Sequence, residues 1–250
     1  MFTKQTIKDI DLKGKTVLLR ADYNVPFENG KITDDYRIKM SLPTVKYLHE
    51  HASKLIICSH LGRPKNAQDK EFSLAPVAKR LSQLLDKKVE FVDDCVGKKV
   101  SDAVKKLPEK GILLLENVRF YPEEEANDKV FAKKLASNAD VFVQDGFGVV
   151  HRAHASTEAI THFLPSVAGE LLEREVDTIT NAMQNPERPL MAIVGGAKIS
   201  DKIELLEKLI PLADVIALGG AMANPFLAAQ GHDVAKSLIE KSDIPLAKEI

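Results

Sequence analysis

Cysteine is scarce in this chain: only two of its 250 residues are cysteines. So few thiols cannot form the disulfide framework that holds small secreted domains together. One of the two, Cys58, lies inside an apolar run of the sequence. We therefore expect both cysteines to be buried free thiols in a reducing cytosol.

Long hydrophobic runs and an excess of charge of one sign are also absent. No run reaches the roughly 18 apolar residues that a membrane-spanning helix needs, and the first residues lack the apolar segment of a secretory signal. The 35 basic and 36 acidic residues nearly cancel, so no general attraction to nucleic acid or to a membrane follows. These absences predict a cytoplasmic protein that binds neither nucleic acid nor membrane.

What the sequence does contain is an alternation of strand and helix patterns. Several runs rich in Val, Ile, Leu and Phe lack polar alternation, which is typical of parallel strands buried on both faces. They lie at residues 16–20, 54–58, 89–92, 112–115, 140–143, 190–194 and 214–218. Helical patterns lie at residues 37–50, 75–85 (with Ser73 as the N-cap), 129–136 and 203–212. The order predicts a layered α/β fold with right-handed crossovers.

A domain boundary is expected between residues 165 and 190. Residues 167–183 carry apolar side chains at helical spacing, and a proline-containing segment ends that pattern before the next strand. We predict an N-terminal α/β domain over residues 1–168, a helix and linker over 169–188, and a second α/β unit over 189–250. Two strands alone do not make a stable α/β domain, so we expect the second unit to be incomplete.

Polar residues follow several of these strand-like runs at their carboxyl ends. Ligands of open α/β sheets bind at this edge, so these residues should converge on one cleft. The candidates in the first domain are Asp22, Tyr23, Asn24, Arg37, His60, Leu61, Gly62, Arg63, Arg119 and Arg152. Several arginines and a histidine in one cleft suit a small, multiply anionic ligand, which indicates a phosphorylated metabolite.

Simpler interpretations exist for these residues. Asp22 and Asn24 are of types common in turns, and Arg37 alone could be a solvated surface charge. Arg119 could pair with the acidic run Glu123–Glu125, which by itself predicts a solvated helix start. A histidine pair at residues 151 and 154 resembles a metal-ligand spacing, but no carboxylate or cysteine set accompanies it, which disfavours a zinc site.

Glycine-rich segments follow two later strands. Residues 195–202 carry two lysines on a strand-to-helix turn, and Gly219 and Gly220 end the next strand. The spacing is neither that of a Walker A loop nor G-x-G-x-x-G, which disfavours a dinucleotide-dependent oxidoreductase. Open backbone, a helix start and two positive charges still suit the phosphates of a nucleotide.

Taken together, these segments resemble the phosphoglycerate kinase family. The matching segments are RADYNVP, DDYRI, SHLGRP, ENVRF, DGFG with HRAHAST, GGAKISDK and GGAM, in order over essentially the whole chain. The resemblance implies a monomeric cytoplasmic enzyme of glycolysis with two Rossmann-like, three-layer parallel-sheet domains, joined by a long helix and closing about a hinge. It also implies reversible phosphoryl transfer between 1,3-bisphosphoglycerate and ADP, which gives 3-phosphoglycerate and ATP and uses Mg²⁺.

The resemblance implies a role for each candidate residue. Asp22, with its neighbours Tyr23 and Asn24, would hold the glycerate hydroxyl and carboxylate. The loop from His60 through Leu61 and Gly62 to Arg63 would grip the non-transferring phosphate with Arg119 and Arg152. Arg37 and Lys198 are the implied catalytic residues, because both would lie against the transferring phosphoryl group. The implied nucleotide-binding residues are Gly195, Gly196, Ala197, Lys198, Lys202, Gly219 and Gly220.

The sequence departs from the family pattern in places. Ala221 stands where a third glycine is usual, Pro225 lies near the expected adenine end of the site, and Gly146 replaces an alanine. The family's magnesium-binding aspartate belongs to a later segment, so we assign no metal ligand within these residues. We expect a truncated chain with little or no kinase activity of its own. The alternative is a non-catalytic module that binds a phosphorylated metabolite in the N-terminal cleft alone.

Overall fold

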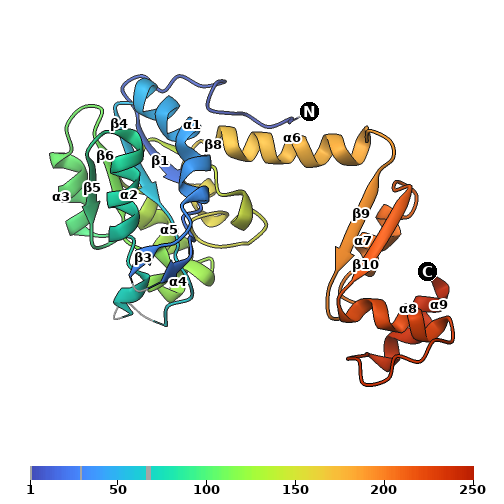
Figure 1. The fold of residues 1–250 in the computed structure, drawn as a ribbon. Coiled ribbons are helices and arrows are strands. Elements are labelled where there is room, and N and C mark those ends of the chain that lie inside the picture. The colour runs from blue at the N-terminus through green and yellow to red at the C-terminus, as the bar shows by residue number, and fades with distance from the viewer. Residues whose placement is uncertain (1, 29, 66–68) are drawn as a thin grey trace. The chain divides into compact units, whose positions relative to one another are not determined.

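The computed structural model describes residues 2–28, 30–65 and 69–250. Its backbone contacts divide the chain into two compact units, Met1–Asp177 and Thr178–Ile250. The boundary falls inside helix α6 (Glu170–Gln184), which is drawn in yellow-orange in Figure 1. Within the described residues, no helix is both long and apolar enough to cross a membrane.

The first unit is built on a parallel sheet. In the described part of the chain, its strands have the order β5-β6-β4-β1-β7-β8. Their bounds are β1 (Thr16–Arg20), β4 (Lys54–Cys58), β5 (Val89–Val92), β6 (Ile112–Leu115), β7 (Val141–Gln144) and β8 (Ser166–Ala168). Strand β1 is central, since it pairs with β4 on one side and β7 on the other. All of the side chains that follow these strands therefore emerge at one edge of the sheet.

Helices cover both faces of this sheet, as Figure 1 shows. On one face, α1 (Tyr36–His51) and α2 (Ala75–Leu85) pack against Val17 and Leu19 of β1. On the other, α3 (Lys98–Lys106) and α5 (Lys129–Ala136) share a core with Leu18. Successive residues of β1 thus lie in opposite cores, which explains why the strand is apolar throughout. A short helix α4 (Pro122–Glu125) and an antiparallel hairpin, β2 (Phe27–Glu28) with β3 (Lys31–Ile32), complete the unit.

Three predicted features of the first unit are wrong in detail. The predicted helix over residues 167–183 begins too early, because Val167 and Ala168 belong to β8 and α6 starts at Glu170. The predicted strand over residues 140–143 is displaced by one residue. Ser73 is not the N-cap of α2, which is Leu74; the Ser73 hydroxyl donates instead to Glu116 at 2.7 Å.

The second unit contains two parallel strands, β9 (Met191–Gly195) and β10 (Val215–Gly219), each shifted by one residue from its prediction. Helix α7 (Ile203–Leu209) is shorter than the predicted 203–212, and α8 (Asn224–Ala229) and α9 (Ile244–Glu249) follow. Pro225 lies in the first turn of α8, where a missing N–H is tolerated. Val194, Leu206 and Met222 are among the residues of a small core.

Candidate active site

A polar cleft of about 330 Å³ opens at the carboxyl edge of the first unit's sheet. It is formed by the segments that follow β1, β4, β6 and β7 together with the first turn of α1. Its lining residues are Asp22, Asn24, Arg37, His60, Gly62, Arg63, Arg119, Gly148, Val149 and Arg152. All of the predicted N-terminal site residues except Tyr23 and Leu61 therefore meet in one place.

Tyr23 and Leu61 lie in the core instead of the cleft. Tyr23 is fully buried, and its hydroxyl lies 3.0 Å from the Ser41 hydroxyl. Leu61 is also buried, and its backbone carbonyl accepts a hydrogen bond of 2.7 Å from the Asn117 side chain. Their side chains support the two loops that carry the neighbouring polar groups.

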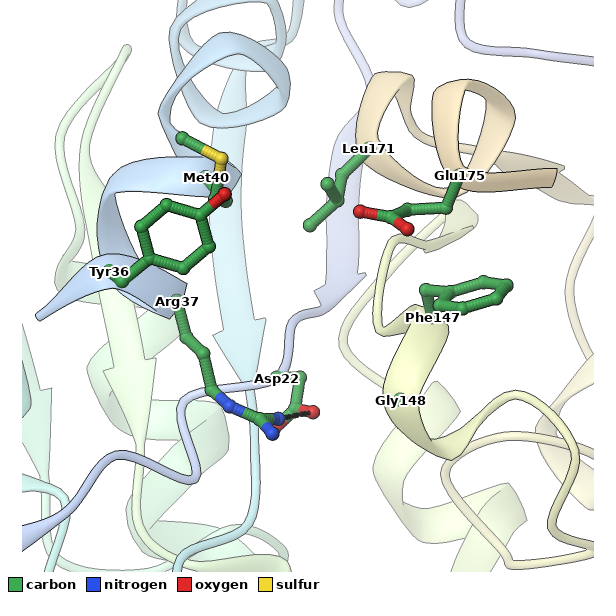
Figure 2. A pocket seen from close by; sticks show the side chains of 8 residues that line it. All are labelled: Asp22, Tyr36, Arg37, Met40, Phe147, Gly148, Leu171 and Glu175. Carbon is green, nitrogen blue, oxygen red and sulfur yellow. Dashed lines mark hydrogen bonds and ion pairs between the residues drawn. The ribbon is translucent and has the colours of Figure 1, made fainter. Parts of the chain in front are cut away.

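The acidic and amide groups of the cleft are held by local hydrogen bonds. The Asp22 carboxylate forms an ion pair with Arg37, which stands in the first turn of α1, as the dashed line in Figure 2 shows. The other oxygen of Asp22 accepts the backbone N–H of Asn24 at 3.1 Å. The side-chain oxygen of Asn24 accepts the N–H of Gly62 at 2.8 Å, which ties the β1 loop to the β4 loop.

Arg63 and Arg152 make fewer contacts with the protein than the other arginines of the cleft. Arg119 is buried, donates to the carbonyl of Gly62 at 2.7 Å and pairs with Glu125 at 3.1 Å. Within the described residues, the guanidinium groups of Arg63 and Arg152 have no hydrogen bond or ion pair. They are therefore available for an anionic ligand, for which guanidinium geometry is well suited.

His60 is almost completely buried at the base of this cleft. Burial, followed by the positive charges of Arg20, Arg119, Arg37 and Arg152, lowers the pKa of its imidazole far below the ordinary range. The ring is therefore neutral at any physiological pH. Its Nδ1 lies 3.2 Å from a terminal nitrogen of Arg20, a residue that the sequence analysis did not single out.

The acidic run that ends in Glu125 was predicted to be solvated, and this is wrong for its central member. Glu124 has no exposed surface. Its carboxylate accepts hydrogen bonds from the hydroxyl and from the backbone N–H of Ser156, the latter at 2.9 Å. The pairing of Arg119 with this run, one of the alternatives predicted, occurs through Glu125.

A second, more apolar pocket of about 280 Å³ adjoins the cleft and shares Asp22, Arg37 and Gly148 with it. In Figure 2 the side chains of Tyr36 and Met40 approach it from α1, and those of Leu171 and Glu175 from α6. Phe147, from the segment that follows β7, lines the pocket and lies below Glu175 in this view.

No group of three or more His, Cys, Asp or Glu side chains could hold a metal ion, as far as the described residues go. Cys58 and Cys95 are both buried and free, as predicted. Burial raises the pKa of the Cys58 thiol to about 12, which makes it a weak nucleophile.

The glycine-rich segments of the second unit lie side by side. Gly195 and Gly219 are paired at the ends of β9 and β10. Gly220 has a φ of 71°, and a Cβ there would lie 2.8 Å from the carbonyl oxygen of Gly196, so this close approach requires glycine. Lys198 is half-exposed and lies 3.4 Å from Glu240, while Lys202 is the N-cap of α7. Their roles toward a nucleotide stay predictions.

Comparison with known proteins identifies the family. The family model for phosphoglycerate kinase matches residues 7–250. A phosphoglycerate kinase of Moorella thermoacetica is 51% identical over 247 residues, and one of Desulforudis audaxviator is 53% identical over 246. The alignments cover 99% and 98% of this chain but 63% of each relative.

Solved structures give the same result. The phosphoglycerate kinase of Coxiella burnetii matches with a TM-score of 0.85 and 41% identity, over 99% of this chain and 62% of that one. The enzyme of Pyrococcus horikoshii matches with a TM-score of 0.83 and 31% identity, over 98% and 64%. The match thus spans nearly all of this chain and somewhat under two thirds of its relatives, and the chain belongs to the phosphoglycerate kinase family.

Proposed function

We propose that the first unit binds 3-phosphoglycerate or 1,3-bisphosphoglycerate, and that the second unit contributes to binding ADP or ATP. The reaction is the reversible transfer of a phosphoryl group between 1,3-bisphosphoglycerate and ADP. The observation that carries this proposal is the cleft at the carboxyl edge of the sheet. It gathers four arginines and a neutral histidine beside one carboxylate and one amide, a set that suits a phosphate at one end of a ligand and hydroxyl and carboxyl groups at the other.

In this proposal each group of the cleft has a distinct task. Arg63, Arg119 and Arg152 bind the phosphate that is not transferred. The Asp22 carboxylate accepts a hydrogen bond from the glycerate portion, and the Asn24 amide can both donate to it and accept from it. Arg37 stabilises the negative charge on the phosphoryl group during its transfer, and Lys198 of the second unit does so from the nucleotide side.

The chemistry needs no general base. The acceptor of the phosphoryl group is a carboxylate, which is already ionised near neutral pH. The protein holds the reactants in line and places positive charge around the equatorial oxygens of the transferring phosphoryl group. Closure of two domains about a hinge would exclude water and so protect the acyl phosphate from hydrolysis.

Bound together with the nucleotide, Mg²⁺ would neutralise charge on its phosphates. The described residues do not offer an acidic cluster that would hold it by themselves. No step assigned above to a side chain of this chain depends on it.

We further propose that these 250 residues bind phosphoglycerate but turn over little. The chain matches 63% of the length of these relatives, and the family resemblance implies that the magnesium-binding aspartate belongs to a later segment. We place the protein in the cytoplasm as a monomer.

Calorimetric titration of 3-phosphoglycerate into the 250-residue chain tests the proposal. We expect saturable binding that weakens with salt and is lost in the double variant Arg37→Ala, Arg63→Ala. The control is Lys31→Ala with Lys79→Ala, which removes the same charge from exposed positions outside the cleft and should leave binding unchanged. A folded wild-type chain that binds no 3-phosphoglycerate would contradict the assignment of the cleft.

A further inference from the structure

Arg20 is a fully buried arginine beneath the anion cleft. It ends the central strand β1, and only 1% of its surface is exposed. Its guanidinium donates to the backbone carbonyl of Ala21 and, through Nε, to the hydroxyl of Ser156 at 2.7 Å. A terminal nitrogen lies 3.2 Å from Nδ1 of His60. Arg20 does not line the cleft, so it is not a direct ligand of a bound anion.

A buried charge needs a counter-charge, and Arg20 has one at the end of a short relay. The hydroxyl of Ser156 accepts from Arg20 and donates its own proton to the carboxylate of Glu124. Glu124 is itself without exposed surface. Arg20 and Glu124 are therefore linked through Ser156 within the core of the fold.

The contact between Arg20 and His60 decides where the imidazole carries its proton. A guanidinium has N–H donors and no acceptor, and it stays charged at all relevant pH values. Nδ1 of His60 must therefore act as the acceptor of this hydrogen bond. In a neutral imidazole the proton then resides on Nε2, for which the described residues provide no hydrogen-bond partner.

Asp22 offers the competing arrangement. Its carboxylate oxygen lies 4.0 Å from the same Nδ1, beyond hydrogen-bond distance. Without Arg20, this carboxylate would favour a proton on Nδ1 and would favour the imidazolium. Arg20 thus prevents the protonation of Nδ1 that a neighbouring aspartate usually favours.

We infer that Arg20 is a positioning residue that holds His60 as the neutral Nε2–H tautomer, so that the ring presents one directed N–H donor to an anion in the cleft. The inference rests on the proposed function for the identity of that anion, and on geometry alone for the tautomer. The depressed pKa of His60 agrees with it, since burial and four surrounding arginines disfavour a second proton.

This assignment gives His60 a task that differs from that of the arginines. The guanidinium groups bring positive charge and several N–H donors to a phosphate, whereas the neutral ring offers one N–H donor and no charge. The donor would also be present over the whole range from pH 5 to 8, because the ring does not titrate there.

The tautomer can be measured in the ligand-free chain. Long-range ¹H–¹⁵N correlation spectra of the protein with ¹⁵N-labelled histidine distinguish protonated from unprotonated ring nitrogens, and His60→Gln identifies the His60 signals by their loss. We expect Nε2 protonated and Nδ1 unprotonated from pH 5 to 8. A proton on Nδ1, or a titration near the ordinary pKa of histidine, would overturn the inference.

The role of Arg20 is tested by the double variant Arg20→Met, Glu124→Gln, which removes both buried charges together and so leaves neither unpaired. We expect the His60 ring to titrate, or its proton to move to Nδ1. An unchanged Nε2–H signal in the folded double variant would show that Arg20 does not set the tautomer. Ser156→Ala, which keeps the contact between Arg20 and His60, should leave the tautomer as in the wild type.

Two isosteric variants of His60 test the use of the N–H and do not depend on the folding of the double variant. The amide nitrogen of Gln can occupy the place of Nε2, whereas that of Asn corresponds to Nδ1. We expect His60→Gln to bind 3-phosphoglycerate within about threefold of the wild type and His60→Asn about tenfold more weakly, because one hydrogen bond to a charged group is lost. Equal affinities of the two variants would overturn the inference. If the wild type binds no 3-phosphoglycerate, the proposed function fails, while the spectra still decide the tautomer.

Discussion

The carboxylate of Asp145 accepts the backbone N–H of Leu171 at 3.0 Å, across 26 residues of sequence. The same oxygen lies 3.3 Å from the N–H of Leu172, and the N–H of Glu170 donates to the Thr44 hydroxyl at 3.0 Å. Side chains from the end of β7 and from α1 therefore satisfy the first N–H groups of α6, which a helix leaves without partners of its own. Asp145 lies in the segment that also carries Gly148 and Arg152 of the cleft, so one carboxylate connects that segment to α6.

The first prediction concerns the pH dependence that this buried carboxylate causes. Burial raises the pKa of Asp145 from 3.8 to about 6 in the folded chain. Between those values the folded chain holds a proton that the unfolded chain releases, so the contribution of Asp145 to the free energy of unfolding is greatest at low pH. It falls as the pH rises to about 6, by roughly 3 kcal/mol at most.

Asp145→Asn keeps an oxygen acceptor for Leu171 and does not titrate. The free energy of unfolding of this variant, relative to the wild type, should therefore increase between pH 4 and 7 by up to about 3 kcal/mol. Urea denaturation of both proteins, followed by circular dichroism at several pH values, measures the difference. A difference that does not vary with pH would contradict the assignment of the raised pKa.

The second prediction distinguishes two neighbouring glutamates. Glu124→Gln keeps the shape and an acceptor for Ser156 but leaves the buried charge of Arg20 uncompensated, and should lower the free energy of unfolding by about 3 kcal/mol. Glu123→Gln removes the same charge from an exposed position and should change it by less than about 0.5 kcal/mol. Urea denaturation at neutral pH measures both. Equal effects would mean that Glu124 is solvated in solution.

The third prediction is that substitutions of two cleft arginines differ in their effect on the stability of the folded chain. Arg63→Ala and Arg119→Ala each remove a proposed phosphate ligand, and each should weaken the binding of 3-phosphoglycerate about tenfold or more. Only Arg119 also holds the carbonyl of Gly62, so only Arg119→Ala should lower the free energy of unfolding, by about 1–3 kcal/mol. Calorimetry and urea denaturation of the same samples test this. A comparable loss of stability in Arg63→Ala would show that Arg63 is engaged with the protein.

The fourth prediction uses two glycines of the loop after β7. A Cβ on Gly148 would lie 2.6 Å from the Asp22 carboxylate that pairs with Arg37, whereas the nearest atom to a Cβ on Gly146 is 3.2 Å away. Gly148→Ala should displace Asp22 and weaken the binding of 3-phosphoglycerate at least about fivefold, and Gly146→Ala should change it less than about twofold. If the two variants bind equally well, the spacing between Gly148 and Asp22 does not constrain the site.

The strands of the sheet could largely be predicted, because continuous apolar runs report burial on two faces. Leu18 and Leu19 illustrate the reason, since adjacent residues of one strand lie in different cores. Strand β8 could not be recognised in this way. Its three residues carry little pattern of their own, and Val167 continues the helical spacing of the segment that follows.

The residues of the cleft could be predicted from the rule that ligands bind where parallel strands end. Arg20 and Glu124 could not, because whether a charged residue is buried depends on its partners. Arg20 meets Ser156 across 136 residues, and Ser156 meets Glu124 across 32. Partners this far apart in the sequence cannot be identified from the local pattern of charges. An arginine that closes a central apolar strand is the one local signal that could have indicated a buried charge.

The position of β1 at the centre of the sheet has a consequence for synthesis on the ribosome. The first strand to emerge must wait for β4 on one side and for β7 on the other, and Val17 pairs with Val141. Arg152, which completes the set of cleft arginines, lies in the segment after β7. A nascent chain that ends before this point exposes one edge of its central strand and lacks a finished anion cleft. The cleft arginines are therefore all present before β8, the edge strand that completes the sheet, has been synthesised.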